Sequence, residues 1–472
     1  MRGYGRTGIG IGIVLFFLAL RVPMLLAREP FFDELLTVWY ARKPLSQHWS
    51  ILAGDSGSPL YLAIARLVQI FGEFSVTGGR LLSLVFGLAA LGTCLSFRDL
   101  GASRWTAAAA LAAFPPHIFF STEARAYSLA ATLIGVATFA LYRWKERGTR
   151  WYLTAAVIAL VLAAYSHSYG VLFFPLPFVV SLLTRNRRSI LVGLAASAAT
   201  GVLFLPGFWL ASEQPLTSID WMRASTLPER LALVAGSFFQ LGFAAPYQPV
   251  LLTPPPLWLQ IVSIGVVATV VGIGVRKSST ARFFGTLILV PIGAVFAFAA
   301  AGKTFYFPTR FESTMSVPFA LLLASALAVI PRKAAVAGLA TLITIGGLVA
   351  VRSTLAHAGE PLTPYRAVAR FLTAPGLPDL DVVVSGYAYL EVISAIGEEG
   401  VTAYPAEQAL HPGWVGPSDA AALATELPGL PRRFVWVGVA GTPEAAALAR
   451  RFNLRMIFNE GPVVAALAEE KA

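Results

Sequence analysis

The apolar residues of this chain are gathered into long blocks that hold few charges. Each block is close to the roughly 20 residues that a helix needs to cross a lipid bilayer. Eleven such blocks are present, at 8–27, 81–97, 106–120, 126–142, 151–165, 168–184, 190–210, 257–275, 283–301, 313–330 and 334–351. The pattern predicts a polytopic α-helical membrane protein with about 11 transmembrane helices.

The composition agrees with this prediction. Hydrophobic residues make up 56% of the chain and charged residues 13%, against roughly 25% charged in a soluble domain, which excludes an ordinary water-soluble protein. The first block follows Arg2 and Arg6 as a secretory signal would, but no small-residue cleavage site follows it, so we expect an uncleaved span. The single cysteine, Cys94, excludes an intrachain disulfide and a metal cluster built on thiolates.

The charged residues predict the side of the membrane on which each loop lies. The net charge is +11, and in a membrane protein such an excess reflects topology more often than nucleic-acid binding, so no nucleic-acid partner is expected. With a cytoplasmic N-terminus, the loops on that side hold sixteen cations against only Asp99 and Glu146. We therefore predict a prokaryotic inner or plasma membrane protein whose N-terminus is cytoplasmic and whose C-terminus is extracytoplasmic.

Two domains are expected. Residues 1–351 form the transmembrane part, with long outer loops at 28–80 and 211–256, and an apolar stretch at 231–245 is interpreted as a re-entrant or interfacial helix. Residues 352–472 regain charge and predict a small extracytoplasmic α/β domain, with strands at 381–384 and 433–437 and helices at 363–373, 418–426 and 443–452. This tail has no GxGxxG or P-loop spacing that would mark a nucleotide site.

The first outer loop carries the acidic pair Asp33-Glu34. In one interpretation the two carboxylates only start a helix, Asp33 as its cap and Glu34 in its first turn. In the other interpretation Asp33 is a general base that faces a lipid-borne substrate, because partial desolvation at the bilayer edge suits its pKa to that work. In both interpretations the helix is expected to lie on the membrane surface, with Trp39 and Tyr40 at headgroup level.

Three further outer turns carry candidate chemistry, and each leaves two interpretations open. Glu123 and Arg125 could be an ion pair between helices, or Arg125 could bind phosphate through its forked donors. His167 could be a hydrogen-bonded interfacial histidine or part of a site. Lys303 and Arg310 could reach lipid headgroups or bind a substrate phosphate.

The joint placement of these residues says more than each one alone. Carboxylates and cations come from different loops and meet at one depth on the outer face. Transfer from a lipid phosphate needs a base to activate the acceptor hydroxyl, and it needs little general-acid help because phosphate leaves as a stabilised anion. One essential carboxylate would therefore suffice.

These residues resemble the membrane glycosyltransferases of the GT-C fold that use polyprenyl-phosphate sugars, the class of protein O-mannosyltransferases and aminoarabinose transferases. The likeness spans nearly the whole chain and is strongest in 20–130. It rests on Arg21-Val22-Pro23, Phe32-Asp33-Glu34, Asp55 with Pro59-Leu60-Tyr61, Arg80-Leu81-Leu82-Ser83, Glu123-Ala124-Arg125-Ala126-Tyr127, His167 with Tyr169-Gly170, Arg310-Phe311 and Pro364-Tyr365-Arg366. The chain departs from the family at Gly57-Ser58 and Phe311, which leaves the acceptor open.

The resemblance implies a role for each matching residue. Asp33 would be the catalytic base and Glu34 its support. The donor phosphate would be held by Arg125, Lys303 and Arg310, and the substrate pocket lined by Asp55, Tyr61, Glu123, Tyr127, His167 and Tyr169. Some relatives need a divalent metal and others do not, so a metal on the outer carboxylates stays open.

The sequence thus predicts an enzyme that moves one hexosyl or pentosyl unit from a polyprenyl-phosphate donor to a lipid, glycan or protein acceptor, with inversion. Membrane lipids and an unidentified acceptor would be its other partners. One alternative is an oligosaccharide ligase or polymerase that uses polyprenyl diphosphate donors. Another is a lipid-sugar flippase or transporter, which would show polar or broken helices at the bilayer midplane and an internal repeat. A structural membrane anchor would not need the outer acidic pair.

Overall fold

The computed structural model describes residues 2–30, 32–54, 57–184, 186–214, 257–301, 310–357, 364–374, 380–385, 388–405, 420–461 and 463–471. The chain forms two compact units. The helical unit comprises Met1–Arg28, Ser58–Ser212 and Ile219–Ala356, and the mixed unit comprises Glu29–Gly57, Glu213–Ser218 and His357–Ala472. Residues 29–57 thus share a unit with the tail, a grouping that the division into 1–351 and 352–472 does not anticipate.

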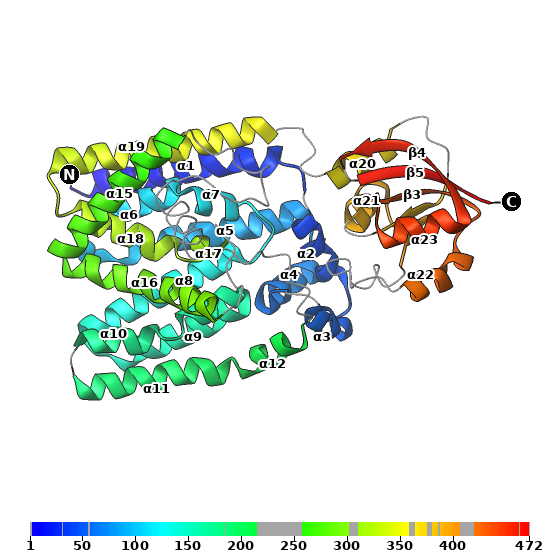
Figure 1. The fold of residues 1–472 in the computed structure, drawn as a ribbon. Coiled ribbons are helices and arrows are strands. Elements are labelled where there is room, and N and C mark those ends of the chain that lie inside the picture. Colours follow the sequence, from blue (N-terminus) through cyan, green and yellow to red (C-terminus); the bar gives the residue numbers. More distant parts are fainter. Residues whose placement is uncertain are drawn as a thin grey trace. The chain divides into compact units, whose positions relative to one another are not determined.

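The helical unit begins with α1 (Arg2–Ala27) and is built almost entirely of helices (Figure 1). The others are α4 (Pro59–Phe71), α5 (Val76–Ser96), η1 (Arg98–Leu100), α6 (Ser103–Ala113), α7 (Pro115–Phe120), α8 (Tyr127–Arg147), α9 (Arg150–Ser166), η2 (Ser168–Phe173), α10 (Leu176–Thr184), α11 (Arg187–Leu203), α12 (Leu205–Glu213), α15 (Leu257–Lys277), α16 (Ser279–Ala300), α17 (Arg310–Thr314), α18 (Ser316–Leu327) and α19 (Arg332–His357). Each predicted apolar block falls on one of these helices or on two consecutive ones.

Within the described residues, three helical segments are long and apolar enough to cross a membrane, at Thr7–Ala27, Val76–Ser96 and Ser279–Phe298. The pair α11 and α12, bent by 44°, gives a fourth if it is counted as one span. These segments support a membrane protein, and the number of eleven spans stays a prediction.

Several predicted spans are broken rather than continuous. The block 106–120 is interrupted at Phe114, whose ψ of 113° is extended, and α7 starts at the following prolines. A residue before proline is pushed out of the helical region, and a proline fits the first turn of a new helix. The blocks 168–184, 190–210 and 313–330 are likewise divided, into η2 and α10, α11 and α12, and α17 and α18. Each block was predicted as one span, and these breaks within the blocks were not predicted.

The packing of the helical unit centres on α8 and α18. All twelve residues of α18 are buried, and α18 packs against α5, α6, α8, α15 and α16. The helix α8 packs in turn against α5 and α9. The start of α8 is therefore held on several sides, and the candidate site is built around it.

The mixed unit contains a five-stranded sheet in the order β2-β1-β3-β5-β4. The strands are β1 (Val382–Val384), β2 (Val401–Ala403), β3 (Arg433–Val439), β4 (Phe452–Glu460) and β5 (Val463–Glu470), and the helices are α2 (Phe32–Arg42), α3 (Leu45–Gly54), α20 (Pro364–Leu372), α21 (Ala388–Ile396), α22 (Ala420–Glu426), η4 (Leu427–Gly429) and α23 (Pro443–Arg451). β1 is parallel to β2 and β3, whereas β5 is antiparallel to β3 and β4. The predicted small α/β tail is present, and the strands β2, β4 and β5 and the helix α21 are additional to those predicted.

Candidate active site

The first part of the site is the turn 121–126 between α7 and α8, which carries Glu123 and Arg125. Glu123 is fully buried and Arg125 is half-buried. The turn packs so closely on α5 that a Cβ on Gly79 would lie 2.6 Å from the Cβ of Ala124. Glycine at position 79 therefore allows the backbone of α5 to support the turn directly.

Two arginines, one in α1 and one directly after it, contact this turn from one side. Arg21, fully buried, donates from Nε to the Ser121 hydroxyl at 2.7 Å, and Arg28 donates to the Thr122 carbonyl at 2.8 Å. On the other side Ser83 of α5 donates to the Arg125 carbonyl at 3.2 Å. The backbone that presents Arg125 is thus fixed by three polar side chains.

Arg21 also donates to a backbone carbonyl that is left without a partner at the break between α6 and α7. Pro116 has no N–H, so the carbonyl of Ala112 loses its partner within the helix. The Nη1 of Arg21 donates to that carbonyl at 2.9 Å, and its Nη2 lies 2.9 Å from His117 Nδ1. A backbone carbonyl freed by proline in an apolar bundle needs such a replacement, which explains an arginine inside the first apolar block.

The second part of the site is the turn at His167, between α9 and η2. A Cβ on Gly170 would lie 2.4 Å from the backbone nitrogen of Ala164, so glycine lets this turn fold back on the end of α9. The His167 ring lies 4.7 Å from the Tyr169 ring and 4.9 Å from the Tyr127 ring, measured between centroids. The Tyr169 amide donates to His167 Nδ1 at 3.2 Å.

The third part is α17, which brings Arg310 to the same place. The guanidinium carbon of Arg310 lies 5.6 Å from the centroid of the Tyr127 ring, within the range of a cation–π contact. The next residue, Phe311, is fully buried and its ring lies 5.4 Å from the Tyr169 ring. Three segments far apart in the sequence therefore meet around Tyr127: the turn 121–126, the turn at His167 and α17.

The charges of this cluster act on the histidine. Burial, followed by the positive charges of Arg310 and Arg125, lowers the pKa of His167 from 6.5 to about 3. The two guanidinium groups are thus close enough to His167 to repel a proton from it. The imidazole is neutral at physiological pH, and the guanidinium groups of the cluster have the donor geometry that suits a phosphate group.

Tyr61, predicted for the substrate pocket, contributes to the support of the cluster. Its hydroxyl lies 3.2 Å from the Gly79 carbonyl and 3.2 Å from the Ser83 hydroxyl. Its ring is buried with Ala126 and Leu129. Tyr61 therefore ties α4 to the part of α5 that supports the turn 121–126.

Two predicted site residues, Asp55 and Lys303, lie outside the described residues. The apolar stretch 231–245 does so as well. Over the described ranges, no group of three or more His, Cys, Asp and Glu side chains could hold a metal ion.

The acidic pair lies on α2 of the mixed unit. The helix begins at Phe32, so Asp33 and Glu34 are both in its first turn, where carboxylates are stabilised by the helix dipole. Asp33 is half-buried and Glu34 fully buried. All residues from Glu34 to Ala41, including Trp39 and Tyr40, are buried, so the expectation of a surface helix was wrong: α2 packs against α21 of the same unit.

An ion cluster fixes the chain just before α2 in this unit. Glu29 accepts hydrogen bonds from Arg366 Nε at 3.3 Å and from Arg370 Nε at 3.1 Å, and both arginines belong to α20. Arg366 also donates to the Ser394 hydroxyl of α21 at 2.9 Å. The tail therefore holds the chain four residues before Asp33.

No role for Arg28 and no backbone contacts of Arg80 were predicted from the sequence. Arg80, 3% exposed, donates from Nη1 to the carbonyls of Leu25 at 2.9 Å and Arg28 at 2.7 Å. The guanidinium of Arg28 also lies 4.8 Å over the Phe119 ring. The available signal was the position of Arg28 at the end of an apolar block on the side where cations are not expected.

The described helices and sheet together have the GT-C fold, which confirms the predicted fold. Among solved structures, the chain is similar to ArnT from Cupriavidus metallidurans in the apo state, with a TM-score of 0.61 and 14% identity over 99% of this chain and 98% of that one. The structure of ArnT bound to undecaprenyl phosphate gives the same TM-score, 0.61, and the same identity, 14%, over 98% of each chain. The Archaeoglobus fulgidus oligosaccharyltransferase complex with Zn and sulfate matches with a TM-score of 0.53 and 14% identity, over 97% of this chain and 72% of that one. No family model and no curated protein matches the chain.

Proposed function

We propose that this protein is an integral membrane glycosyltransferase that moves a single sugar from a polyprenyl-phosphate donor to an acceptor on the extracytoplasmic side. The observation that carries the proposal is the meeting of Arg125, Arg310 and His167 around Tyr127 in a chain with the GT-C fold. A solved structure with the same fold, ArnT, is bound to undecaprenyl phosphate. That lipid has the carrier part of the donor proposed for this chain, without the sugar.

The cationic cluster would hold the donor phosphate. A guanidinium presents several N–H donors in a planar fork that matches phosphate oxygens, so Arg125 and Arg310 can bind the group from two segments. His167 is neutral, and it can donate one hydrogen bond to the phosphate. Tyr127 and Tyr169 would line the pocket beside it, Glu123 would contact the substrate, and Lys303 would add a third cation.

Asp33 would be the general base. Its carboxylate takes the proton of the acceptor hydroxyl while the hydroxyl oxygen bonds to the anomeric carbon of the sugar. The bond between that carbon and the donor phosphate oxygen breaks, and the polyprenyl phosphate leaves as an anion. Attack from the face opposite the phosphate inverts the anomeric carbon, so a second catalytic carboxylate is not required.

Two other features would support this base. Glu34 and Asp55 would assist Asp33 in the acidic loop. The ion cluster of Glu29 with Arg366 and Arg370 fixes the chain on the amino-terminal side of α2. The tail would thereby help to position the base.

Mass analysis of lipid-linked sugars tests the proposal in cells. Cells that lack the protein, or that carry Asp33→Asn, should accumulate a polyprenyl-phosphate monosaccharide and lose one sugar from a surface glycan, lipid or protein. Glu146→Gln, an exposed carboxylate far along α8, is the matched control and should restore the wild-type pattern. Accumulation of an oligosaccharide carrier would favour a ligase or polymerase instead. Normal lipid-linked sugars in the Asp33→Asn cells would refute the assignment of the base.

A further inference from the structure

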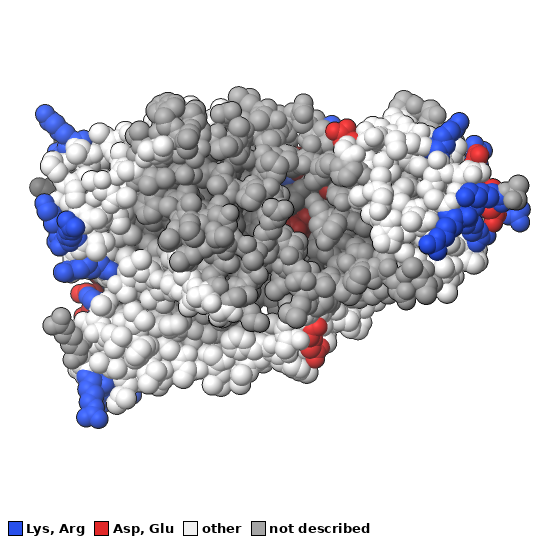
Figure 2. Space-filling view, in the orientation of Figure 1, with Lys and Arg blue, Asp and Glu red and all other residues white. Residues whose placement is uncertain are grey.

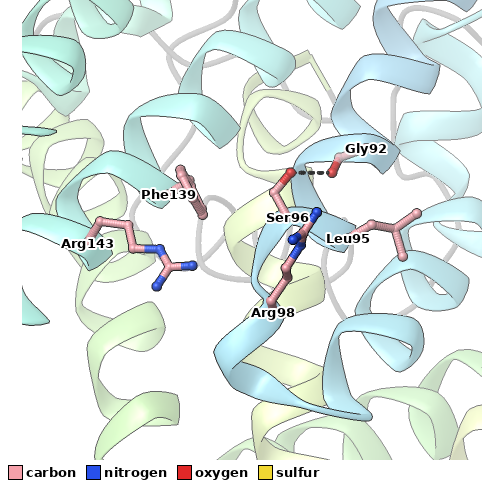
Figure 3. Close-up of a pocket in the computed structure, with 6 residues that line it drawn as sticks. All are labelled: Gly92, Leu95, Ser96, Arg98, Phe139 and Arg143. Atoms are coloured by element: carbon pink, nitrogen blue, oxygen red, sulfur yellow. Dashed lines mark hydrogen bonds between the residues drawn. The ribbon is translucent and has the colours of Figure 1, made fainter.

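A groove between α5 and α8 lies at the far end of these helices from the candidate active site. Its volume is about 460 Å³, and it is lined by Gly92, Leu95, Ser96, Arg98, Phe139 and Arg143 (Figure 3). The site residue Tyr127 begins α8, and Arg143 follows sixteen residues later, which is about 24 Å along a helix. The groove is therefore a separate feature that the proposed transfer does not use.

Two arginines face each other across the groove. In Figure 3, Arg143 extends from α8 toward Ser96 and Arg98 on the other side. Arg98 is exposed and its guanidinium has no hydrogen-bond or ion-pair partner within the described part of the chain. Arg143 is 7% exposed and pairs through one nitrogen with Asp99, which leaves further N–H donors of its guanidinium for another group.

The walls of the groove continue as apolar faces along both helices. On α5, Val85 is seven residues before Gly92 and eleven before Ser96, so the three share one face. On α8, Val136 shares a face in the same way with Phe139 and Arg143. Val85 is 58% exposed and Val136 38% exposed. The exposed apolar surface therefore extends from the arginines along α5 and α8, toward the middle of their length.

We propose that this groove binds an anionic phospholipid, with its phosphate between Arg98 and Arg143 and an acyl chain along the faces of Gly92 and Phe139. Cationic side chains at the mouth and apolar side chains below them match the two parts of such a lipid. A free anion in water would gain nothing from the apolar part. A zwitterionic lipid would bring its own cation next to the arginines.

The surroundings of the groove favour the same ligand. Lys and Arg gather at this end of the helical unit, while the described residues along the side in view are largely uncharged (Figure 2). By the charge bias of membrane loops this is the cytoplasmic end, and basic pockets between helices on that side bind anionic headgroups. The α5 wall belongs to a helix that is long and apolar enough to cross a membrane.

The charged part and the apolar part of the proposed lipid site can be changed by separate substitutions. Arg98→Gln removes the unpaired charge. Gly92→Leu fills the groove without changing charge, because a Cβ at Gly92 meets no atom within 4 Å. Gly272→Leu on α15 is its matched control, since Gly272 is also exposed, helical and without atoms near its Cβ. Arg188→Gln on α11 is the control for the charge, since Arg188 is exposed as well.

Native mass spectrometry and thermal unfolding of the purified full-length protein, with added phosphatidylglycerol, phosphatidylcholine or inorganic phosphate, test the proposal. Phosphatidylglycerol should bind and raise the unfolding temperature, and both Arg98→Gln and Gly92→Leu should weaken this binding about tenfold or more. The two control variants should bind as the wild type does. Equal binding of phosphatidylcholine, full competition by inorganic phosphate, or unchanged binding in both groove variants would overturn the proposal.

Discussion

Arginines lie near both ends of α8, but the surroundings of these arginines differ. Beside the turn 121–126 that precedes α8, the guanidinium groups of Arg28 and Arg80 are buried and donate to backbone carbonyls. At the other end, Lys145 pairs with its neighbour Glu146, and Arg147 is exposed and lies 3.4 Å from the Tyr152 hydroxyl.

This difference separates two reasons for the presence of a cation in a membrane protein. An exposed cation such as Arg147 fits the charge bias of membrane loops, and that bias needs no defined geometry. Arg28 and Arg80 are instead held in place by tertiary contacts, as is Arg143, which is 7% exposed and pairs with Asp99. Desolvated arginines are costly in an apolar bundle, so the hydrogen bonds of Arg28 and Arg80 to backbone carbonyls are needed to stabilise them there.

Among the substitutions that test this comparison, Arg21→Gln should have the largest effect, and the effect is on the free energy of unfolding. The change removes donors from the Ala112 carbonyl and the Ser121 hydroxyl, both of them buried. The free energy of unfolding should fall by about 3 kcal/mol, since unsatisfied buried groups cost about 1–3 kcal/mol each. Arg188→Gln, at the exposed end, should change it by less than about 0.5 kcal/mol. Denaturant titration in detergent micelles measures both, and equal losses would contradict the comparison.

A smaller effect is expected from Arg310→Gln on donor binding. Loss of charged hydrogen bonds should weaken the affinity for a polyprenyl phosphate by about 10- to 100-fold. Arg310→Lys should recover only part of this affinity, because an ammonium lacks the planar fork. Arg147→Gln at the other end of the bundle should leave the affinity unchanged. Isothermal titration with undecaprenyl phosphate makes the measurement, and an unchanged affinity in Arg310→Gln would remove Arg310 from the donor site.

The depressed pKa of His167 predicts a pH dependence of stability. The unfolded histidine titrates near 6.5, whereas the pKa of the folded one is about 3. The unfolded chain therefore takes up a proton first as the pH falls, and stability is lost below about pH 6.5. Between pH 7 and pH 5 the loss should be about 1–2 kcal/mol larger in the wild type than in His167→Asn. Parallel pH profiles in the two proteins would show that neither burial nor the nearby guanidinium groups lower the pKa of His167 in the folded protein.

The smallest effect should follow Glu29→Gln in the mixed unit. The pair with Arg366 is partly buried, so its loss should weaken the support of α2 by about 1 kcal/mol. Sugar transfer should slow about fivefold while the tail stays folded. Glu470→Gln, which removes the pair with Arg451 elsewhere in the same unit, is the matched control. Equal turnover in the two variants would show that the ion cluster does not position Asp33.

Hydropathy located the membrane part well, because long apolar blocks have few alternatives to helices in a bilayer. The breaks at Phe114 and Met315 were not predicted, although Pro115 and Pro116 gave a local signal for the first one. The tail was predicted less completely. β5 contains alanines at 465, 466 and 468, which favour helix, and it forms a strand because β3 and β4 pair with both of its edges.

The residue types of the candidate site could be predicted from the sequence. The contacts that hold its backbone in place could not. Arg125, His167 and Arg310 could be found from polar turns between apolar blocks, and the structure brings them together around Tyr127. The roles of Arg21 and Arg28 depend on which carbonyls a distant helix leaves unpaired, and a single sequence does not contain that information. The placement of Asp33 in one unit with the tail depends in the same way on long-range contacts such as Glu29 with Arg370.

The most direct test of the proposed transfer is to follow the donor itself. Purified protein in nanodiscs would be supplied with lipid-linked sugars extracted from cells that lack it, together with membrane acceptors from the same cells. Mass spectrometry should then show conversion of a polyprenyl-phosphate monosaccharide into free polyprenyl phosphate by the wild type. Asp33→Asn should be slower by about 100-fold or more. Equal conversion by the variant, or conversion by neither protein, would contradict a transfer that uses Asp33.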